Sequence, residues 1–139
     1  MEKIIIIAMF VQVTLSLVVM VIMGKRRFAA AKNKHIQLSD FAAMRLDNAG
    51  DHVRVADRNF SNQFEIPVLF YAGCLLALQL NMASVSIAVL ACIFVATRII
   101  HSLIHLGSNH LRARFRVFLL GCLSVFVMWF LLLLGVLLN

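Results

Sequence analysis

In the stretch DRNFSNQFEIPVLFYAGCLLALQL, residues 57–80, a polar segment passes into an apolar one. The apolar part, Ile66 to Leu80, is shorter than the roughly 20 residues with which a helix crosses a hydrocarbon core. A helix that spans here must begin earlier, near Arg54, and Pro67 is compatible with it if neighbouring groups satisfy the backbone. Such a helix carries three polar side chains into the bilayer region: Arg58, Asn62 and Glu65.

The composition is that of an integral membrane protein. Of the 139 residues, 63% are hydrophobic and only 14% are charged, which excludes the soluble globular classes. The first apolar run, Ile4 to Met23, is a retained helix rather than a signal peptide, because it lacks a small-residue cleavage site and its basic cluster comes after it. We therefore predict an all-α fold, an integral membrane four-helix bundle in one domain, residues 1–139. Its helices are expected at about 4–23, 54–80, 83–106 and 114–138.

The basic residues indicate how the chain lies in the membrane. The net charge is +7 without a nucleic-acid-binding motif, and eight of the 13 lysines and arginines fall within residues 24–60. Residues 107–116 add three arginines, so the positive-inside rule predicts that both loops are cytoplasmic. Short loops without targeting features favour a bacterial inner membrane. The three cysteines lie in separate apolar runs without metal-ligand spacing, so we expect no metal site.

Two polar stripes interrupt the apolar helices near the predicted cytoplasmic side. Arg58, Asn62 and Glu65 are spaced i, i+4 and i+7, so they share one face of a helix. The third helix carries a second stripe with the spacing i, i+3 and i+7, and its members are Arg98, His101 and His105. Two helices therefore direct polar side chains toward one region of the bundle.

A charged side chain inside the bilayer costs roughly 2.5–3.5 kcal/mol on insertion scales, so it normally faces a partner or a polar cavity. Glu65 is the acidic residue that lies deepest along the four spans, and we expect it to pair with Arg98. The pair has two interpretations, an ion pair that fixes helix packing and a part of a binding site. The other stripe members, with Arg112, Arg114 and Arg116, favour a cationic site for a small polyanion that carries carboxylates.

These blocks resemble a known family. The pattern Arg58-x-x-x-Asn62-x-x-Glu65 followed by a proline, and then Arg98-x-x-His101 before HLG and an arginine-rich loop, is similar to the MAPEG family. Its members are the membrane-associated proteins in eicosanoid and glutathione metabolism. The resemblance implies four-helix subunits that assemble as homotrimers. It also implies that glutathione, as co-substrate, lies between neighbouring subunits near the cytoplasmic side.

The resemblance also gives roles to single residues. It implies that five residues of the two stripes help to bind glutathione: Arg58, Asn62, Glu65, Arg98 and His101. An arginine at the start of the fourth helix is expected to stabilise the glutathione thiolate, and Arg114 matches it best, with Arg112 next. An arginine just after the first helix also contributes in the family, which points to Arg26, with Lys25 and Arg27 as alternatives.

The chain departs from the family pattern at two places. His105 stands where many members have a tyrosine, and the gap from Glu65 to Pro67 is shorter than in the mammalian enzymes. Because His105 can still donate a hydrogen bond, glutathione binding survives these departures better than a specific catalysis does. Eicosanoid synthesis is not implied.

The sequence thus predicts a membrane-bound, glutathione-dependent transferase or peroxidase that acts on small lipophilic electrophiles from the surrounding lipid. The alternative is a non-catalytic MAPEG-like membrane protein that binds lipid or a partner. A third interpretation is a proton-coupled exporter built on Glu65. It ranks last, because such exporters usually carry the glutamate in the first helix with few cations nearby.

Overall fold

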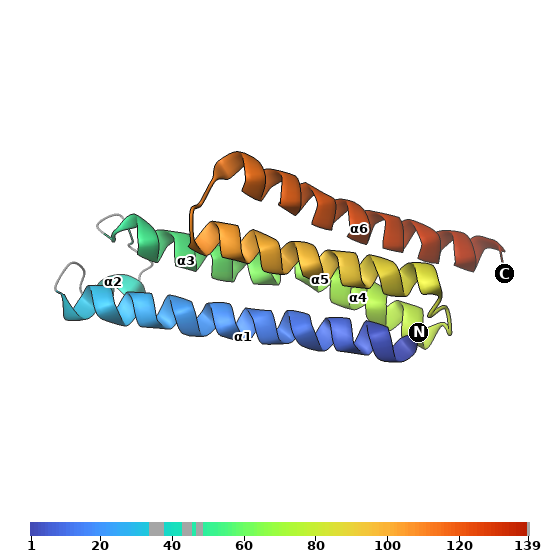
Figure 1. The fold of residues 1–139 in the computed structure, drawn as a ribbon. Coiled ribbons are helices and arrows are strands. Elements are labelled where there is room, and N and C mark those ends of the chain that lie inside the picture. The colour runs from blue at the N-terminus through green and yellow to red at the C-terminus, as the bar shows by residue number, and fades with distance from the viewer. Residues whose placement is uncertain (34–37, 43–45, 47–48, 139) are drawn as a thin grey trace.

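The regular elements of the protein are helices throughout the described part of the chain. The computed structural model describes residues 1–33, 38–42, 46 and 49–138. The helices are α1 Glu2–Lys32, α2 Leu38–Ala42, α3 Asp51–Ser61, the 3₁₀ turn η1 Asn62–Phe64, α4 Ile66–Gln79, α5 Val85–Leu106 and α6 Leu111–Leu138 (Figure 1). This confirms the all-α fold that the sequence predicts.

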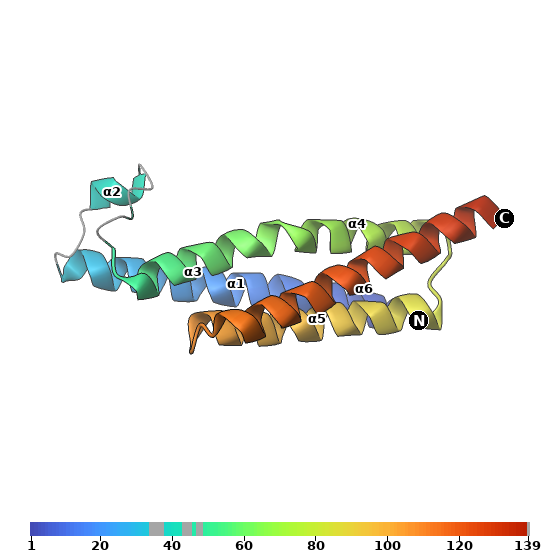
Figure 2. The same cartoon turned by 90° about the horizontal axis from the view of Figure 1, so that it is seen from above.

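The helices form an elongated bundle. In Figures 1 and 2, α1, α5 and the pair α3–α4 run side by side, and α6 crosses over α5 toward α4. Both termini and the α4–α5 turn lie at one end, whereas α2 and the α5–α6 turn lie at the other. We call the latter the basic end, because the end of α1, the helix α3 and the start of α6, which carry lysines and arginines of residues 24–60 and 107–116, lie there (Figure 1). The two predicted cytoplasmic loops therefore lie on the same side of the bundle.

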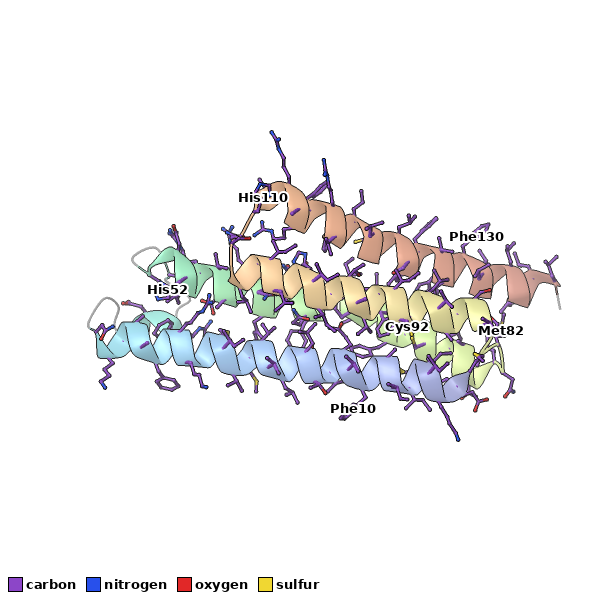
Figure 3. All side chains as sticks on the ribbon, viewed as in Figure 1. Phe10, His52, Met82, Cys92, His110 and Phe130 are labelled. Atoms are coloured by element: carbon purple, nitrogen blue, oxygen red, sulfur yellow. The ribbon has the colours of Figure 1, made fainter. Side chains whose placement is uncertain are left out.

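Three of the described helices are long and apolar enough to cross a membrane: α1, α5 and α6. Their outer faces are apolar, and Phe10 of α1 and Phe130 of α6 are 69% and 50% exposed (Figure 3). Such faces suit contact with lipid. The 14 residues of α4 extend only about 21 Å at 1.5 Å per residue, so α4 alone is shorter than a hydrocarbon core of about 30 Å. The fourth span, which would also need η1 and α3, stays a prediction.

The helix that the sequence predicts at 54–80 is interrupted. Glu65 leaves helical geometry, with φ −96° and ψ −101°, and it caps the start of α4. The physical reason is Pro67, which has no N–H and whose ring clashes with the carbonyl of Gln63, four residues earlier. After α3 the backbone forms the 3₁₀ turn η1, and the α-helix ends there. A new helix, α4, begins at Ile66, and the amide of Val68 donates to the carbonyl of Glu65 at 3.2 Å. The prediction of one continuous helix here is wrong.

The other helix boundaries extend the predicted ones. The helix predicted at 4–23 continues to Lys32, because the segment after Gly24 consists largely of good helix formers. The last helix begins at Leu111 rather than 114. α5 begins after a turn at residues 80–84, where the hydroxyl of Ser84 accepts a hydrogen bond from the amide of Ile87. Asn81 in this turn has φ 56°, a left-handed conformation that asparagine tolerates.

The core lies between α4, α5 and α6 and is closed by α1. The rings of Phe70 and Phe94 stack at its centre with a centroid distance of 4.4 Å, and Met128 of α6 is fully buried beside this cluster. A smaller cluster of Ala30, Ala49 and Val53 joins α1 to α3 at the basic end. These two clusters fix α3 and α5 relative to each other, and α3 and α5 carry the two polar stripes.

Candidate functional site

A cavity of about 320 Å³ lies at the basic end between α3–η1, α5 and the first turns of α6. Six of the nine predicted site residues line it: Arg58, Asn62, Glu65, His101, His105 and Arg114. The remaining lining residues are Ser61, Leu111, Phe115 and Phe118. The structure thus brings the whole first stripe, the two histidines of the second stripe and one predicted loop arginine to the same cavity.

The two histidines form the buried side of this cavity. His101 and His105 are 3% and 2% exposed, and their rings meet edge to face with a centroid distance of 5.5 Å. In the described part of the subunit none of their four ring nitrogens has a hydrogen-bond partner. A buried polar group without a partner costs about 1–3 kcal/mol. These nitrogens are therefore suited to a ligand that supplies the missing partners.

The charged groups of the cavity come from three different elements. Arg58 on α3 is exposed and Arg114 on α6 is half-buried, and Nη1 of Arg114 donates to Oδ1 of Asn109. Glu65 adds an exposed carboxylate and Asn62 adds an amide. Two guanidinium groups, an amide and two imidazoles suit a ligand with carboxylates, and the carboxylate of Glu65 suits a ligand amine.

Arg98 does not pair with Glu65. Its side chain is 2% exposed, and Nη2 donates to the backbone carbonyl of Asn62 at 2.9 Å. Both residues are described in full, and no ion pair between them occurs within that part of the structure. The predicted ion pair is wrong because the helix break turns Glu65 to the exposed side of the cavity and frees a carbonyl for Arg98. Arg98 lies behind the cavity lining rather than in it.

Arg26 and Arg112 do not line the cavity of their own subunit either. Arg26 donates to the carbonyls of His52 and Leu106 at 2.9 and 3.0 Å, so it ties α1 to the start of α3 and the end of α5. Arg112 is exposed on α6. Ligand contacts by these two residues stay predictions.

The alternatives to Arg26 differ in what holds them. Arg27 forms an ion pair with Asp57 and lies over the ring of Phe41 at 5.4 Å from its centroid. Lys25 is exposed on α1. Of the three bases that follow the first apolar run, Lys25 is exposed, whereas Arg26 and Arg27 are held by contacts within the subunit.

A network of buried polar side chains supports the cavity from the interior of the bundle. Nε2 of Gln12 donates to Oε1 of Gln63 at 3.0 Å, and Nε2 of Gln63 is within 3.1–3.2 Å of the carbonyl and side-chain oxygens of Asn59 and of the hydroxyl of Ser102. All four residues are at most 2% exposed. The network connects α1, α3, η1 and α5, so it fixes the turn that carries Asn62.

The sequence reasoning missed the apolar wall of the cavity. Leu111, Arg114, Phe115 and Phe118 fall at i, i+3, i+4 and i+7, so they share one face of α6. The spacing is present in the sequence, but it does not stand out where the apolar residues alternate with Arg112, Arg114 and Arg116. The buried network gave a weaker signal, because its members are distant in sequence.

Comparisons with known proteins give one family. No curated protein and no solved structure matches the chain. The model of the MAPEG family matches residues 5–134, nearly the whole chain. The match agrees with the helical fold and with the three helices that are competent to span a membrane. The chain therefore belongs to the MAPEG family, a family of membrane proteins.

Proposed function

We propose that this protein is a membrane-bound, glutathione-dependent transferase or peroxidase that acts on lipophilic electrophiles. The observation that carries the proposal is the cavity in which both polar stripes meet Arg114, with two buried histidines that lack partners. Membership of the MAPEG family supports a glutathione-related role in general.

The donor set of the cavity matches the groups of glutathione, which has two carboxylates, an amine and a thiol. Arg58 is suited to hold a carboxylate, Asn62 to hold a peptide group, and Glu65 to hold the amine. The imidazoles of His101 and His105 are suited to complete their hydrogen bonding with the tripeptide. A ligand without carboxylates would leave the cationic wall without a partner.

Arg114 is the residue proposed to stabilise the thiolate. A guanidinium beside the sulfur favours the ionised form by charge attraction, and the effect grows where water is excluded. The thiolate then attacks the electrophilic carbon or peroxide oxygen of the second substrate. Leu111, Phe115 and Phe118 give this side of the cavity an apolar surface against which a lipophilic substrate can pack.

We further propose a homotrimer in an inner bacterial membrane, with residues 24–60 and 107–116 in the cytoplasm. In such an assembly the base that follows the first apolar run would reach the cavity of a neighbouring subunit. Since Arg26 and Arg27 hold contacts within the subunit, Lys25 is the better candidate for this role. The mass of the purified protein by native mass spectrometry tests the trimer.

The function is tested by calorimetric titration of the purified protein with glutathione, followed by a conjugation assay with a lipophilic electrophile. Saturable binding that is weakened in Arg58→Ala, together with turnover, supports the proposal. Binding of glutathione without turnover of any electrophile would favour the non-catalytic alternative. Absence of saturable binding to the wild-type protein would overturn the proposal.

A further inference from the structure

His105 has a position that ligand binding alone does not require. It lies on the last turn of α5 at the buried side of the cavity, and both of its ring nitrogens lack a partner in the described subunit. A side chain that only donates a hydrogen bond needs one free nitrogen. The second nitrogen of a neutral imidazole carries a lone pair, so the same ring can also accept a proton.

The charged groups around His105 cannot accept a proton themselves. They are Arg114 from α6, Arg58 from α3, and Arg98 from the same helix, with His101 as the neighbouring imidazole. A guanidinium has no acceptor site and stays protonated in proteins. Arg114 can therefore stabilise a thiolate, but the proton that the thiol loses must go to another group.

Glu65 and His101 are the other groups in the cavity wall that could take this proton. The carboxylate of Glu65 is exposed, however, and Glu65 stands between η1 and α4 rather than beside Arg114. An imidazole also matches the basicity needed for proton transfer near neutral pH better than an ordinary carboxylate does. Of the two histidines on α5, the ring of His101 packs against Phe118, whereas His105 is one turn nearer the α5–α6 turn that leads to Arg114. Position and chemistry therefore favour His105.

We propose that His105 is the general base that removes the thiol proton of the bound co-substrate, an inference that rests on the proposed glutathione chemistry. The imidazole lone pair takes the proton of the S–H group, which leaves a thiolate beside Arg114 and an imidazolium at His105. The thiolate forms the S–C bond with the electrophilic carbon of a lipophilic epoxide or activated alkene. The electron pair of the broken C–O or C=C π bond moves to oxygen or carbon, and the imidazolium returns its proton there.

This cycle defines the substrate class. Additions to epoxides and activated alkenes consume the proton within the site and restore neutral His105, with no oxidant or reductant. His101 packs against His105 edge to face, and its ring centroid lies 5.7 Å from that of Phe118. The apolar wall that contains Phe118 then faces the carbon that is attacked.

The experiment compares His105→Gln with His52→Gln, the same substitution at an exposed histidine near the start of α3 (Figure 3). Glutathione binding is measured by calorimetry, and single-turnover conjugation of an epoxide is measured as a function of pH. We expect His105→Gln to bind glutathione within a few-fold of wild type and to lose about 10²-fold in rate near neutral pH, the scale of general base catalysis. The loss should shrink as the pH approaches about 8.5, where a free thiol ionises without help. His52→Gln should keep the wild-type rate and pH profile.

Chemical rescue separates a catalytic role from a structural one. His105→Ala opens space for a small base, so added imidazole should restore part of its rate and should leave the rate of Arg114→Ala unchanged. If His105→Gln fails to fold, as judged by thermal unfolding, the rescue of His105→Ala carries the same test.

Two results overturn the assignment while leaving the proposed function intact. One is a His105→Gln protein that binds glutathione and keeps the wild-type rate and pH profile. The other is a loss of the acidic limb of the pH profile in Glu65→Gln but not in His105→Gln. Absence of glutathione binding to wild type would instead overturn the proposed function, and the assignment of His105 with it.

Discussion

Nη2 of Arg98 donates a 2.9 Å hydrogen bond to the backbone carbonyl of Asn62, which lies 36 positions earlier in the chain. In a continuous α-helix this carbonyl would accept from the amide four residues on. The break before Pro67 withdraws that amide, and a side chain from α5 replaces it. Helix breaks at membrane depth persist only where neighbouring groups satisfy the freed backbone. Arg98 therefore holds open the turn that directs Asn62 and Glu65 into the cavity.

Arg98→Met should weaken glutathione binding although Arg98 does not line the cavity. Loss of the hydrogen bond lets the η1 turn relax. We therefore expect the dissociation constant for glutathione to rise about tenfold, which corresponds to a loss of about 1.4 kcal/mol in binding free energy. The stability should change less than the affinity, because removal of a desolvated charge offsets the lost hydrogen bond. Calorimetry on Arg98→Met is compared with Arg116→Met, which alters an exposed arginine of α6. Equal affinity of Arg98→Met and wild type would contradict the role of Arg98.

Glu65→Gln should affect binding and not stability. Glu65 is exposed and forms no ion pair with Arg98 in the described structure. The free energy of unfolding of the Glu65→Gln protein should therefore stay within about 0.5 kcal/mol of wild type. The affinity for glutathione should fall, because the ligand amine loses its counter-charge. A double-mutant cycle with Arg98→Met measures any coupling. A coupling well above about 0.5 kcal/mol would show that the two residues interact directly.

Part of this site follows from the sequence, because helix geometry is local. The spacing of Arg58, Asn62 and Glu65 puts them on one side of any helix, and the structure keeps all three at the cavity even though the helix breaks between them. The partner of Arg98 does not follow in the same way. Electrostatics alone points to a carboxylate, whereas the acceptor is a carbonyl that becomes free only after Pro67 interrupts a helix in another part of the chain.

The hydrogen-bond partners of the buried amides could not be predicted from the sequence either, because they lie far away in the chain. Gln12 stands alone in an apolar run, and nothing near it in the sequence shows that its partner is 51 positions away. The same holds for Ser102, which hydrogen-bonds across to Asn59 at 3.2 Å. Contacts between helices depend on register and rotation, which the apolar pattern leaves open when every face is apolar.

Gln63→Leu should be the most destabilising change in this network. Gln63 bonds to side chains of three other elements. Its loss leaves Nε2 of Gln12 without an acceptor at a buried position and removes one partner each from Asn59 and Ser102, which still bond to each other. With about 1–3 kcal/mol for an unsatisfied buried group, we expect a loss on this scale in the free energy of unfolding. Gln12→Leu should cost less, because Gln12 makes one side-chain hydrogen bond and its Oε1 is already unpartnered. Equal costs in chemical unfolding of the two variants would argue against the network as described.

Gly121→Ala and Gly24→Ala should change stability in opposite directions. A Cβ at Gly121 would lie 2.8 Å from Oγ1 of Thr97, so it would force α5 and α6 apart and cost about 1–3 kcal/mol. A Cβ at Gly24 would have no atom within 4 Å, and the helical preference of alanine should stabilise α1 by up to about 1 kcal/mol. Thermal unfolding of both variants provides the comparison. A neutral Gly121→Ala would mean that α6 can move away from α5 without cost.

Variants at Arg114 and Arg112 should show which of the two arginines stabilises the thiolate, because the sequence leaves both as alternatives. Arg114 lines the cavity and is held by Asn109, whereas Arg112 is exposed and lies outside the lining. Removal of one group that stabilises developing negative charge typically costs about 10²–10³ in rate. We therefore expect Arg114→Ala to lose conjugation on this scale, and Arg112→Ala to stay near wild type, in a steady-state assay at saturating glutathione. Asn109→Ala should lose less than Arg114→Ala, because it frees the guanidinium without removing it. If Arg112→Ala loses the activity and Arg114→Ala keeps it, the arginine that faces the thiol comes from outside this cavity, and a neighbouring subunit becomes its source.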